Sequence, residues 1–246
     1  MDHMLYVAMS GAKQTMLAQA ANAHNLANVS TTGFKEDLLA LQSWQIGGQG
    51  YPSRVNAVAG QTGTNLSPGT IMTTGGELDV AVSGEGWIAV QAADGSEAYT
   101  RAGDLRITET GTLINGAGHP VLGNGGPIAI PPAEKVEIGN DGTISVRPLG
   151  QAPSALVIVD RIKLVNPDPD QLTKGEDGLL RLEEGEIAAP NASARLISGS
   201  LETSNVNAID AMVNMIALSR QFESQVKLMK VAEENDSVSA RLMAIS

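Results

Sequence analysis

The stretch "SGSLETSNVNAIDAMVNMI", residues 198–216, decides how the chain is read, because a turn and a helix meet in it. Small and polar residues come first, as is typical of a turn. Apolar residues then recur every three or four positions, which predicts a helix that continues to about Leu242. Asn207 is placed to cap this helix, with Asp210 three residues on to meet the exposed amides.

Both ends of the chain show this helical pattern. In the C-terminal part, Met212, Met215, Ser219, Phe222, Val226 and Met229 follow a heptad-like spacing, and five of the six are apolar. Residues 4–29 contain one charged side chain, Lys13, so this helix has to be covered. The positions expected to pack in helix pairing or assembly are Leu5, Met9, Ala12, Met16, Ala20, Ala23, Leu26, Met212, Met215, Phe222, Val226 and Met229.

The middle of the chain has a β pattern. Asp94-Gly95, Asn115-Gly116 and Asp141-Gly142 each separate strand-like runs, which predicts hairpins. The run 155–165 is rich in β-branched residues, and 166–178 has the composition of a surface loop. Gly33 follows the first helix, where a glycine permits a positive φ.

We therefore expect an α+β fold in which N- and C-terminal helices pair as a coiled coil and a central, mainly antiparallel β domain lies between them in the chain. The expected segments are an N-terminal helical assembly segment at 1–32, an extended connector at 33–77, the β-rich domain at 78–190, a return connector at 191–204 and a C-terminal helical assembly segment at 205–246.

Composition excludes several classes of function. A net charge of -11 without a basic cluster argues against nucleic acid as a partner. The chain has no cysteine and no run of apolar residues long enough to span a membrane. Asp2 and His3 stand where a cleaved signal peptide would be basic, so we expect no cleavage.

No residue pattern indicates catalysis. His3, His24 and His119 lie far apart and lack the spacing of a zinc site, and "GAGHPVLGNGG" at 116–126 does not match a phosphate-binding loop. The carboxylates within 166–178 do not fit a calcium-binding loop. We expect no catalytic, cofactor or metal site, and no enzyme.

Two interpretations remain open from the residues alone. The helices can belong to one ordinary domain, or they can be the ends of a subunit whose termini order only inside a polymer. The low charge of the first helix and the methionines of both helices favour an adaptable interface with several neighbours.

Two motifs resemble the flagellar rod and hook family. "NLANVSTTGFK" at 25–35 resembles its N-terminal signature, with His24 where many relatives carry a second Asn, and "GSLETSNVNAIDAMVNMIALSRQFES" at 199–224 resembles its C-terminal one. The stretch 78–123 is similar to the family's middle, and the ending at 231–246 resembles the proximal-rod branch more than the distal-rod branch. The motif residues are Asn25, Leu26, Ala27, Asn28, Gly33, Phe34, Lys35, Leu201, Glu202, Ser204, Asn205 and Val206.

The resemblance implies a structural subunit of the flagellar basal body. Such a subunit would polymerise into the tubular rod that carries motor torque across the periplasm, after export without a cleaved signal peptide. Its partners would be copies of itself, neighbouring rod proteins and the flagellar type III export apparatus, with no small-molecule substrate. A distal-rod or hook-type protein, or a soluble β-rich binding or adhesion module, are the alternatives.

Overall fold

The computed structural model describes residues 3–45, 55–148, 150, 156–182 and 186–245. The chain divides into two compact units. We call residues 1–28, 37–65 and 206–246 the helical unit, and residues 29–36 and 66–205 the β unit. No described helix is both long and apolar enough to cross a membrane.

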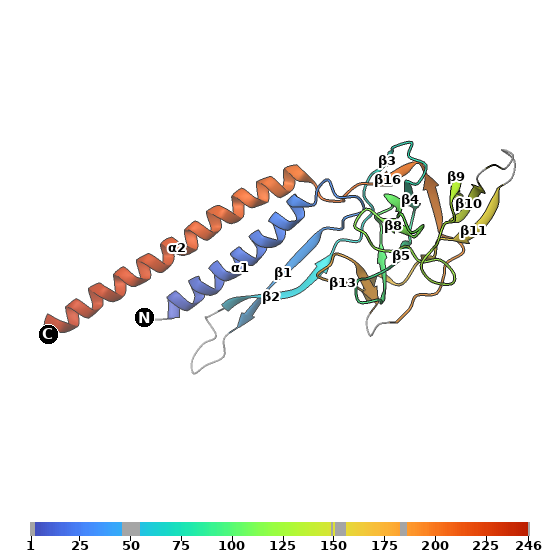
Figure 1. Cartoon of the computed structure of the whole chain (residues 1–246). Helices are drawn as coiled ribbons and strands as arrows, with labels where there is room; N and C mark the ends of the chain where they lie inside the picture. The colour runs from blue at the N-terminus through green and yellow to red at the C-terminus, as the bar shows by residue number, and fades with distance from the viewer. Residues whose placement is uncertain (1–2, 46–54, 149, 151–155, 183–185, 246) are drawn as a thin grey trace. The chain divides into compact units, whose positions relative to one another are not determined.

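The helical unit contains α1 (His3–Ala27) and α2 (Ala208–Ile245), which pack side by side and run antiparallel (Figure 1). This confirms the predicted α+β class and the contact between the terminal helices. Because α2 has 38 residues and α1 has 25, α2 is longer by about 20 Å at the helical rise per residue. Part of α2 therefore extends beyond the end of α1.

Side-chain caps set where the helices begin and end. Asn207 Oδ1 accepts a hydrogen bond from the Ile209 amide at 3.0 Å, and Asn207 Nδ2 donates to Asp210 at 2.7 Å, as expected for the start of α2. Near the end of α1, the buried Asn25 side chain exchanges two 2.9 Å hydrogen bonds with the main chain of Asp37. Asn25 thus joins the last turn of α1 to the strand that follows.

The predicted connector at 33–77 needs correction, because much of it is strand. β1 (Asp37–Gln45) and β2 (Val55–Thr64) pair antiparallel, with a bulge between Leu39 and Leu41, and the pair lies against α1. A short β3 (Ile71–Thr73) follows. The prediction missed these strands because main-chain pairing does not require the regular apolar alternation by which strands are recognised.

The β unit contains the remaining strands, and every strand pair in its described residues is antiparallel. One sheet has the order β12-β5-β6-β14-β13 and another has the order β11-β10-β9, while β15-β4, β16-β3 and β7-β8 form two-stranded pairs. The strands are β4 (Val80–Ser83), β5 (Trp87–Gln91), β6 (Glu97–Thr100), β7 (Leu105–Ile107), β8 (Leu113–Asn115), β9 (Ala133–Ile138), β10 (Thr143–Pro148), β11 (Val157–Arg161), β12 (Leu164–Val165), β13 (Leu172–Lys174), β14 (Leu180–Leu182), β15 (Arg195–Ser198) and β16 (Ser200–Glu202).

Two of the three predicted hairpin turns join paired strands, whereas the turn at Asn115-Gly116 follows β8 and is closed by an isolated bridge between Ile114 and Pro120. Asp94 lies between β5 and β6 and accepts the Ser96 amide at 2.9 Å, and Asp141 does the same for Thr143 at 3.1 Å between β9 and β10. The predicted surface loop at 166–178 is only partly a loop, since it contains the 3-10 helix η1 (Pro169–Gln171) and β13. Leu172 explains the difference, because it packs on a hydrophobic cluster and pairs with Leu182 of β14.

Two hydrophobic clusters stabilise the β unit. The larger one fills the space between the sheets with aliphatic side chains such as Ile88, Leu113 and Ile144. The smaller one contains the fully buried Tyr99, whose hydroxyl oxygen accepts a hydrogen bond from the Ala188 amide at 2.8 Å. Burial in this apolar cluster raises the pKa of Tyr99 to about 12, because the phenolate would lose its hydration.

The raised pKa makes the β unit sensitive to alkaline pH. The folded state keeps the Tyr99 proton while the unfolded chain releases it near pH 10, so stability present below pH 10 is lost as the pH rises toward 12. We expect a loss of about 3 kcal/mol from this group over that range. Chemical unfolding at a series of pH values measures it, with Tyr99→Phe as the control that removes the dependence. A Tyr99→Phe protein with the same alkaline loss would contradict this origin.

Candidate functional site

The helices α1 and α2 contact each other along one side of each helix. On α1 the buried residues include Ala8, Ala12 and Thr15, which recur at helical spacing. Gly11 lets Gln225 of α2 come close, since a β-carbon at Gly11 would lie 3.1 Å from Gln225 Cδ. Asn22 Nδ2 donates to the main-chain oxygen of Ala211 at 2.7 Å. The two helices therefore approach closely along one side of each.

A second apolar stripe lies on each helix away from this face. On α2 its members are more than half exposed, from 54% to 72%, and recur at i, i+3, i+4 and i+7: Ile209, Met212, Val213 and Ile216. At 3.6 residues per turn this stripe is roughly opposite the buried Ala211. On α1 the exposed stripe consists of Tyr6, Met9, Met16 and Leu17. Below, these eight residues are called the outer stripes.

The predicted packing positions are divided between the two faces. Ala12 is buried, and those that are half-buried are Leu5, Leu26, Met215, Phe222 and Met229. The exposed positions are Met9, Met16, Ala20, Ala23, Met212 and Val226. Because both sides of each helix are apolar, spacing alone could not separate the side that packs within the chain from the side left open. A role for the exposed positions in assembly remains a prediction.

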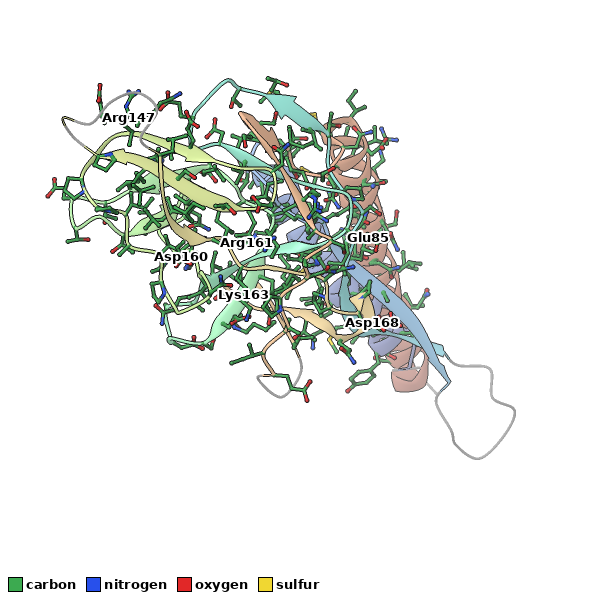
Figure 2. The ribbon with its side chains drawn as sticks, turned by 90° about the vertical axis from the view of Figure 1, so that its right-hand side faces the viewer. Glu85, Arg147, Asp160, Arg161, Lys163 and Asp168 are labelled. Carbon is green, nitrogen blue, oxygen red and sulfur yellow. The ribbon has the colours of Figure 1, made fainter. Side chains whose placement is uncertain are left out.

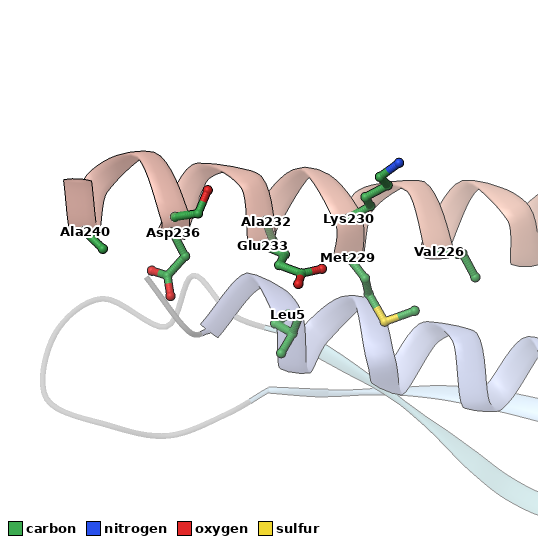
Figure 3. A pocket seen from close by; sticks show the side chains of 9 residues that line it. Leu5, Val226, Met229, Lys230, Ala232, Glu233, Asp236 and Ala240 are labelled. Carbon is green, nitrogen blue, oxygen red and sulfur yellow. The ribbon is translucent and has the colours of Figure 1, made fainter. Parts of the chain in front are cut away.

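A groove of about 710 Å³ lies where α2 runs past the start of α1 (Figure 3). Leu5 of α1 forms one side, and Met229 of α2 points toward α1. The other lining residues are Val226, Lys230, Ala232, Glu233, Asp236, Ser237 and Ala240. Its lining is mixed, because the apolar side chains stand beside Lys230, Glu233 and Asp236.

The β unit contains a buried ion cluster around Glu202, whose side chain is 1% exposed. Glu202 Oε1 accepts from Lys35 Nζ at 2.6 Å and from the Gly69 amide at 2.8 Å. Glu202 Oε2 accepts from Arg101 Nη1 at 2.9 Å. Lys35 and Arg101 are also buried, so the carboxylate is held by charged donors and a main-chain amide away from water.

The cluster contains two cations for one carboxylate, and neutral groups hold the excess positive charge. Lys35 Nζ donates to the Ser67 carbonyl at 2.8 Å, and Arg101 Nη2 donates to the Gly84 carbonyl at 2.8 Å. The Trp87 ring lies 5.7 Å from Lys35 Nζ and 4.9 Å from the Arg101 guanidinium carbon, within cation–π range. Burial lowers the pKa of Lys35, although the hydrogen bond and charge of Glu202 act in the opposite direction.

The same cluster joins two chain segments that are far apart in the sequence. The Gly33 amide donates to the Glu202 carbonyl at 2.8 Å, and the Glu36 amide donates to Asn205 Oδ1 at 2.8 Å. Lys174 lies over the Phe34 ring at 4.0 Å and donates to a main-chain oxygen of the same segment at 2.7 Å. Residues 33–36 and 202–205 thus lie side by side in the β unit.

Gly33 has the conformation that its position predicted. Its φ is +66°, and a β-carbon there would lie 2.3 Å from the carbonyl carbon of Arg101. A larger residue would therefore be strained and would also collide with the main chain. Gly33 lets the chain pass against Arg101 immediately before Lys35 enters the ion cluster.

The motif residues have structural roles in both units. The side-by-side segments 33–36 and 202–205 contain Gly33, Phe34, Lys35, Glu202 and Asn205. Asn25 instead bonds the end of α1 to the strand that follows, and Asn28 Nδ2 donates to the His24 carbonyl at 3.0 Å. The motif positions placed elsewhere are Leu26 and Ala27 at the end of α1, Leu201 on β16, and the buried Ser204 and Val206.

Sequence reasoning missed Arg101 and Trp87 as parts of the cluster. Each lies near the end of a strand-like run, where an arginine usually points into water. No local signal pairs Arg101 with a glutamate a hundred positions away. Only the meeting of distant segments at Glu202 shows their role.

Glu202→Gln is expected to destabilise the β unit by about 3–5 kcal/mol, because it leaves two buried cations without an anion. Thermal or chemical unfolding followed by circular dichroism measures the change. Glu109→Gln, at an exposed turn, is the matched control and is expected to be nearly neutral. Equal stability of the two variants would show that the cluster contributes little.

The chain is similar to known flagellar proteins along most of its length. Three family profiles match in chain order: "Flagella basal body rod protein" over residues 5–35, "Flagellar hook protein FlgE/F/G D1 domain" over residues 81–146, and "Flagellar basal body rod FlgEFG protein C-terminal" over residues 197–242. A paired set of terminal helices, a separate β unit and these matches define an axial structural protein of the flagellum.

Full-length relatives specify the branch. The flagellar basal-body rod proteins FlgF of Salmonella typhimurium and of Escherichia coli K12 are each 41% identical to this chain over the whole of both sequences. The rod protein FlgG of Bacillus subtilis is 34% identical over 94% of this chain and 95% of its own. The chain belongs to the flagellar basal-body rod protein family, in its FlgF branch. It is a structural subunit of the rod of the basal body and not an enzyme.

Proposed function

We propose that this subunit joins the rod through the outer stripes of α1 and α2, which pack against helices of neighbouring subunits. The observation that supports this proposal is that each helix has two apolar sides and that pairing within the chain covers only one of them. Copies of this chain and other rod proteins are the proposed neighbours.

The energetics support assembly through these stripes. Full burial of a large apolar side chain contributes about 1.5–3 kcal/mol. The eight outer-stripe residues are roughly half exposed, so covering them would release on the order of 1 kcal/mol each. Such a sum can offset the loss of translational and rotational freedom on association. The methionines Met9, Met16 and Met212 suit contacts with several differently shaped neighbours.

The same proposal assigns different tasks to the two units. The helical unit would form the polymerising part, in keeping with assembly segments at 1–32 and 205–246. The β unit has its own hydrophobic clusters and ion cluster, so it would fold by itself and form the outer surface. Contacts between unlike surfaces of successive subunits build helical assemblies, and they would spread motor torque over many residues.

We also propose that the chain reaches the rod in the periplasm by unfolded export through the flagellar type III apparatus, without cleavage of a signal peptide. The absence of cysteine supports passage through an oxidising compartment, since the chain cannot form wrong disulfides there.

Met212→Asp is expected to abolish swimming and rod assembly, because assembly would bury an unpaired carboxylate. The isolated chain is expected to stay folded, since Met212 is exposed in it. Asn214→Asp is the matched control, with the same new charge on an exposed position of the same helix outside the outer stripe. Swimming tests and electron microscopy of basal bodies measure assembly, and circular dichroism measures helix content. Normal swimming of the Met212→Asp strain would contradict the proposal.

A further inference from the structure

The three-stranded sheet of the β unit ends in a strand edge that is apolar on both sides. β11 is an edge strand in the order β11-β10-β9. Its first half exposes Val157 (51%) and Ile158 (70%), and Leu156 just before it is also exposed. Because neighbouring residues of a strand point to opposite faces, apolar side chains stand on both faces at this edge.

The other edge of the same sheet is protected by charge. β9 carries Glu134, Lys135 and Glu137, and Lys135 pairs with Glu137 at 2.8 Å on the surface. Charged residues on an edge strand are a common means of preventing unwanted pairing. The first half of β11 has no such residue, and its charged residues Asp160 and Arg161 come only at its C-terminal end (Figure 2).

A second apolar edge lies elsewhere on the β unit. β3 pairs only with β16 among the described strands, and it exposes Ile71 and Met72 on opposite faces. It carries no charged residue. Figure 1 shows β3 and β11 at different sides of the β unit. One subunit therefore offers two unlike apolar strand edges.

We propose that the edge of β11 pairs with β3 of a second copy of this chain, which extends the sheet from one subunit to the next. The inference rests on the proposed function, because a rod subunit has copies of itself as neighbours. Two observations select β3 as the occupant. It is short and extended, so it presents open main-chain groups, and its Ile71 and Met72 match the apolar side chains on both faces of β11.

The use of two different edges has a geometric consequence. Pairing of β11 with another β11 would be symmetric and would stop at a dimer, whereas pairing of β11 with β3 leaves one free edge of each kind on every new subunit. The contact can then repeat along a helical assembly. It spans only three or four residues per strand, far less than the surface that a stable dimer usually buries, so it acts together with the helix contacts rather than alone.

Disulfide cross-linking tests the contact directly, because the chain has no cysteine of its own. Paired strands place facing Cα atoms within the range that a disulfide bridges. The full-length chain carrying both Ile158→Cys and Met72→Cys is oxidised in assembled rods and run on a non-reducing gel. We expect a ladder of dimers, trimers and longer products. The control joins Met72→Cys with Ile187→Cys, because Ile187 is 69% exposed in the β unit and equals Ile158 in kind and exposure.

A second pair of variants measures the contribution to assembly. Ile158→Lys is expected to lower the yield of rods by about tenfold, since it puts a charge on the pairing edge. Ile187→Lys is expected to leave the yield unchanged, and circular dichroism of both proteins checks that they fold.

The results that would overturn the proposal are distinct from failure of the helix contacts. A ladder no stronger than that of the Ile187→Cys control would overturn it. Disulfide dimers of the single variant Ile158→Cys would also overturn it, because one cysteine per chain can join only two copies of β11. Normal assembly of Ile158→Lys, together with failed assembly of Met212→Asp, would contradict the edge contact and support the helix proposal. Normal rods in the Met212→Asp strain, together with a persisting ladder, would contradict the helix proposal and support the edge contact.

Discussion

The carboxylate of Glu202 is the constraint that holds two distant segments of the β unit together. It is buried, and it binds Lys35, Arg101 and a main-chain amide at the place where two distant chain segments lie side by side. A buried ion pair adds less stability than its Coulomb energy suggests, because its groups lose their hydration. Removing one member is costly, however, so the cluster permits one arrangement of these segments and penalises others. The cluster is thus the physical link between two sequence motifs that lie more than 160 positions apart.

The helical unit follows a different principle. Its helices are apolar on more sides than one partner helix can cover, and Gly11 allows a close approach to Gln225 on the side that is covered. In a folding unit that stayed monomeric, the outer stripes would be a liability, since exposed apolar patches of this kind promote association. In a rod subunit they are available for packing between molecules. The same interaction, burial of apolar surface, stabilises the fold on one side of each helix and, in the proposed rod contact, would stabilise assembly on the other.

The division into two units separates these tasks physically. The β unit has its own hydrophobic clusters and its own buried ion cluster, which supports the proposal that it folds by itself. The helical unit offers surface that neighbours can complete. The strand edges of the β unit that lack protective charges would add the second, weaker contact proposed above. Several modest contacts distributed in this way suit an assembly that is built one subunit at a time.

The sequence by itself determined the helices, their cap at Asn207, the hairpin turns and the need for a glycine at position 33, because these depend on residues close together in the chain. The family motifs include Lys35 and Glu202, although nothing in the sequence indicated that the two side chains pair. Only the tertiary structure decided which apolar side of each helix is covered and that Arg101 and Trp87 complete the ion cluster. It also decided that β1 and β2 pair in the expected connector. Those features depend on contacts between distant segments, and a contact of this kind leaves no periodic signal in the local sequence.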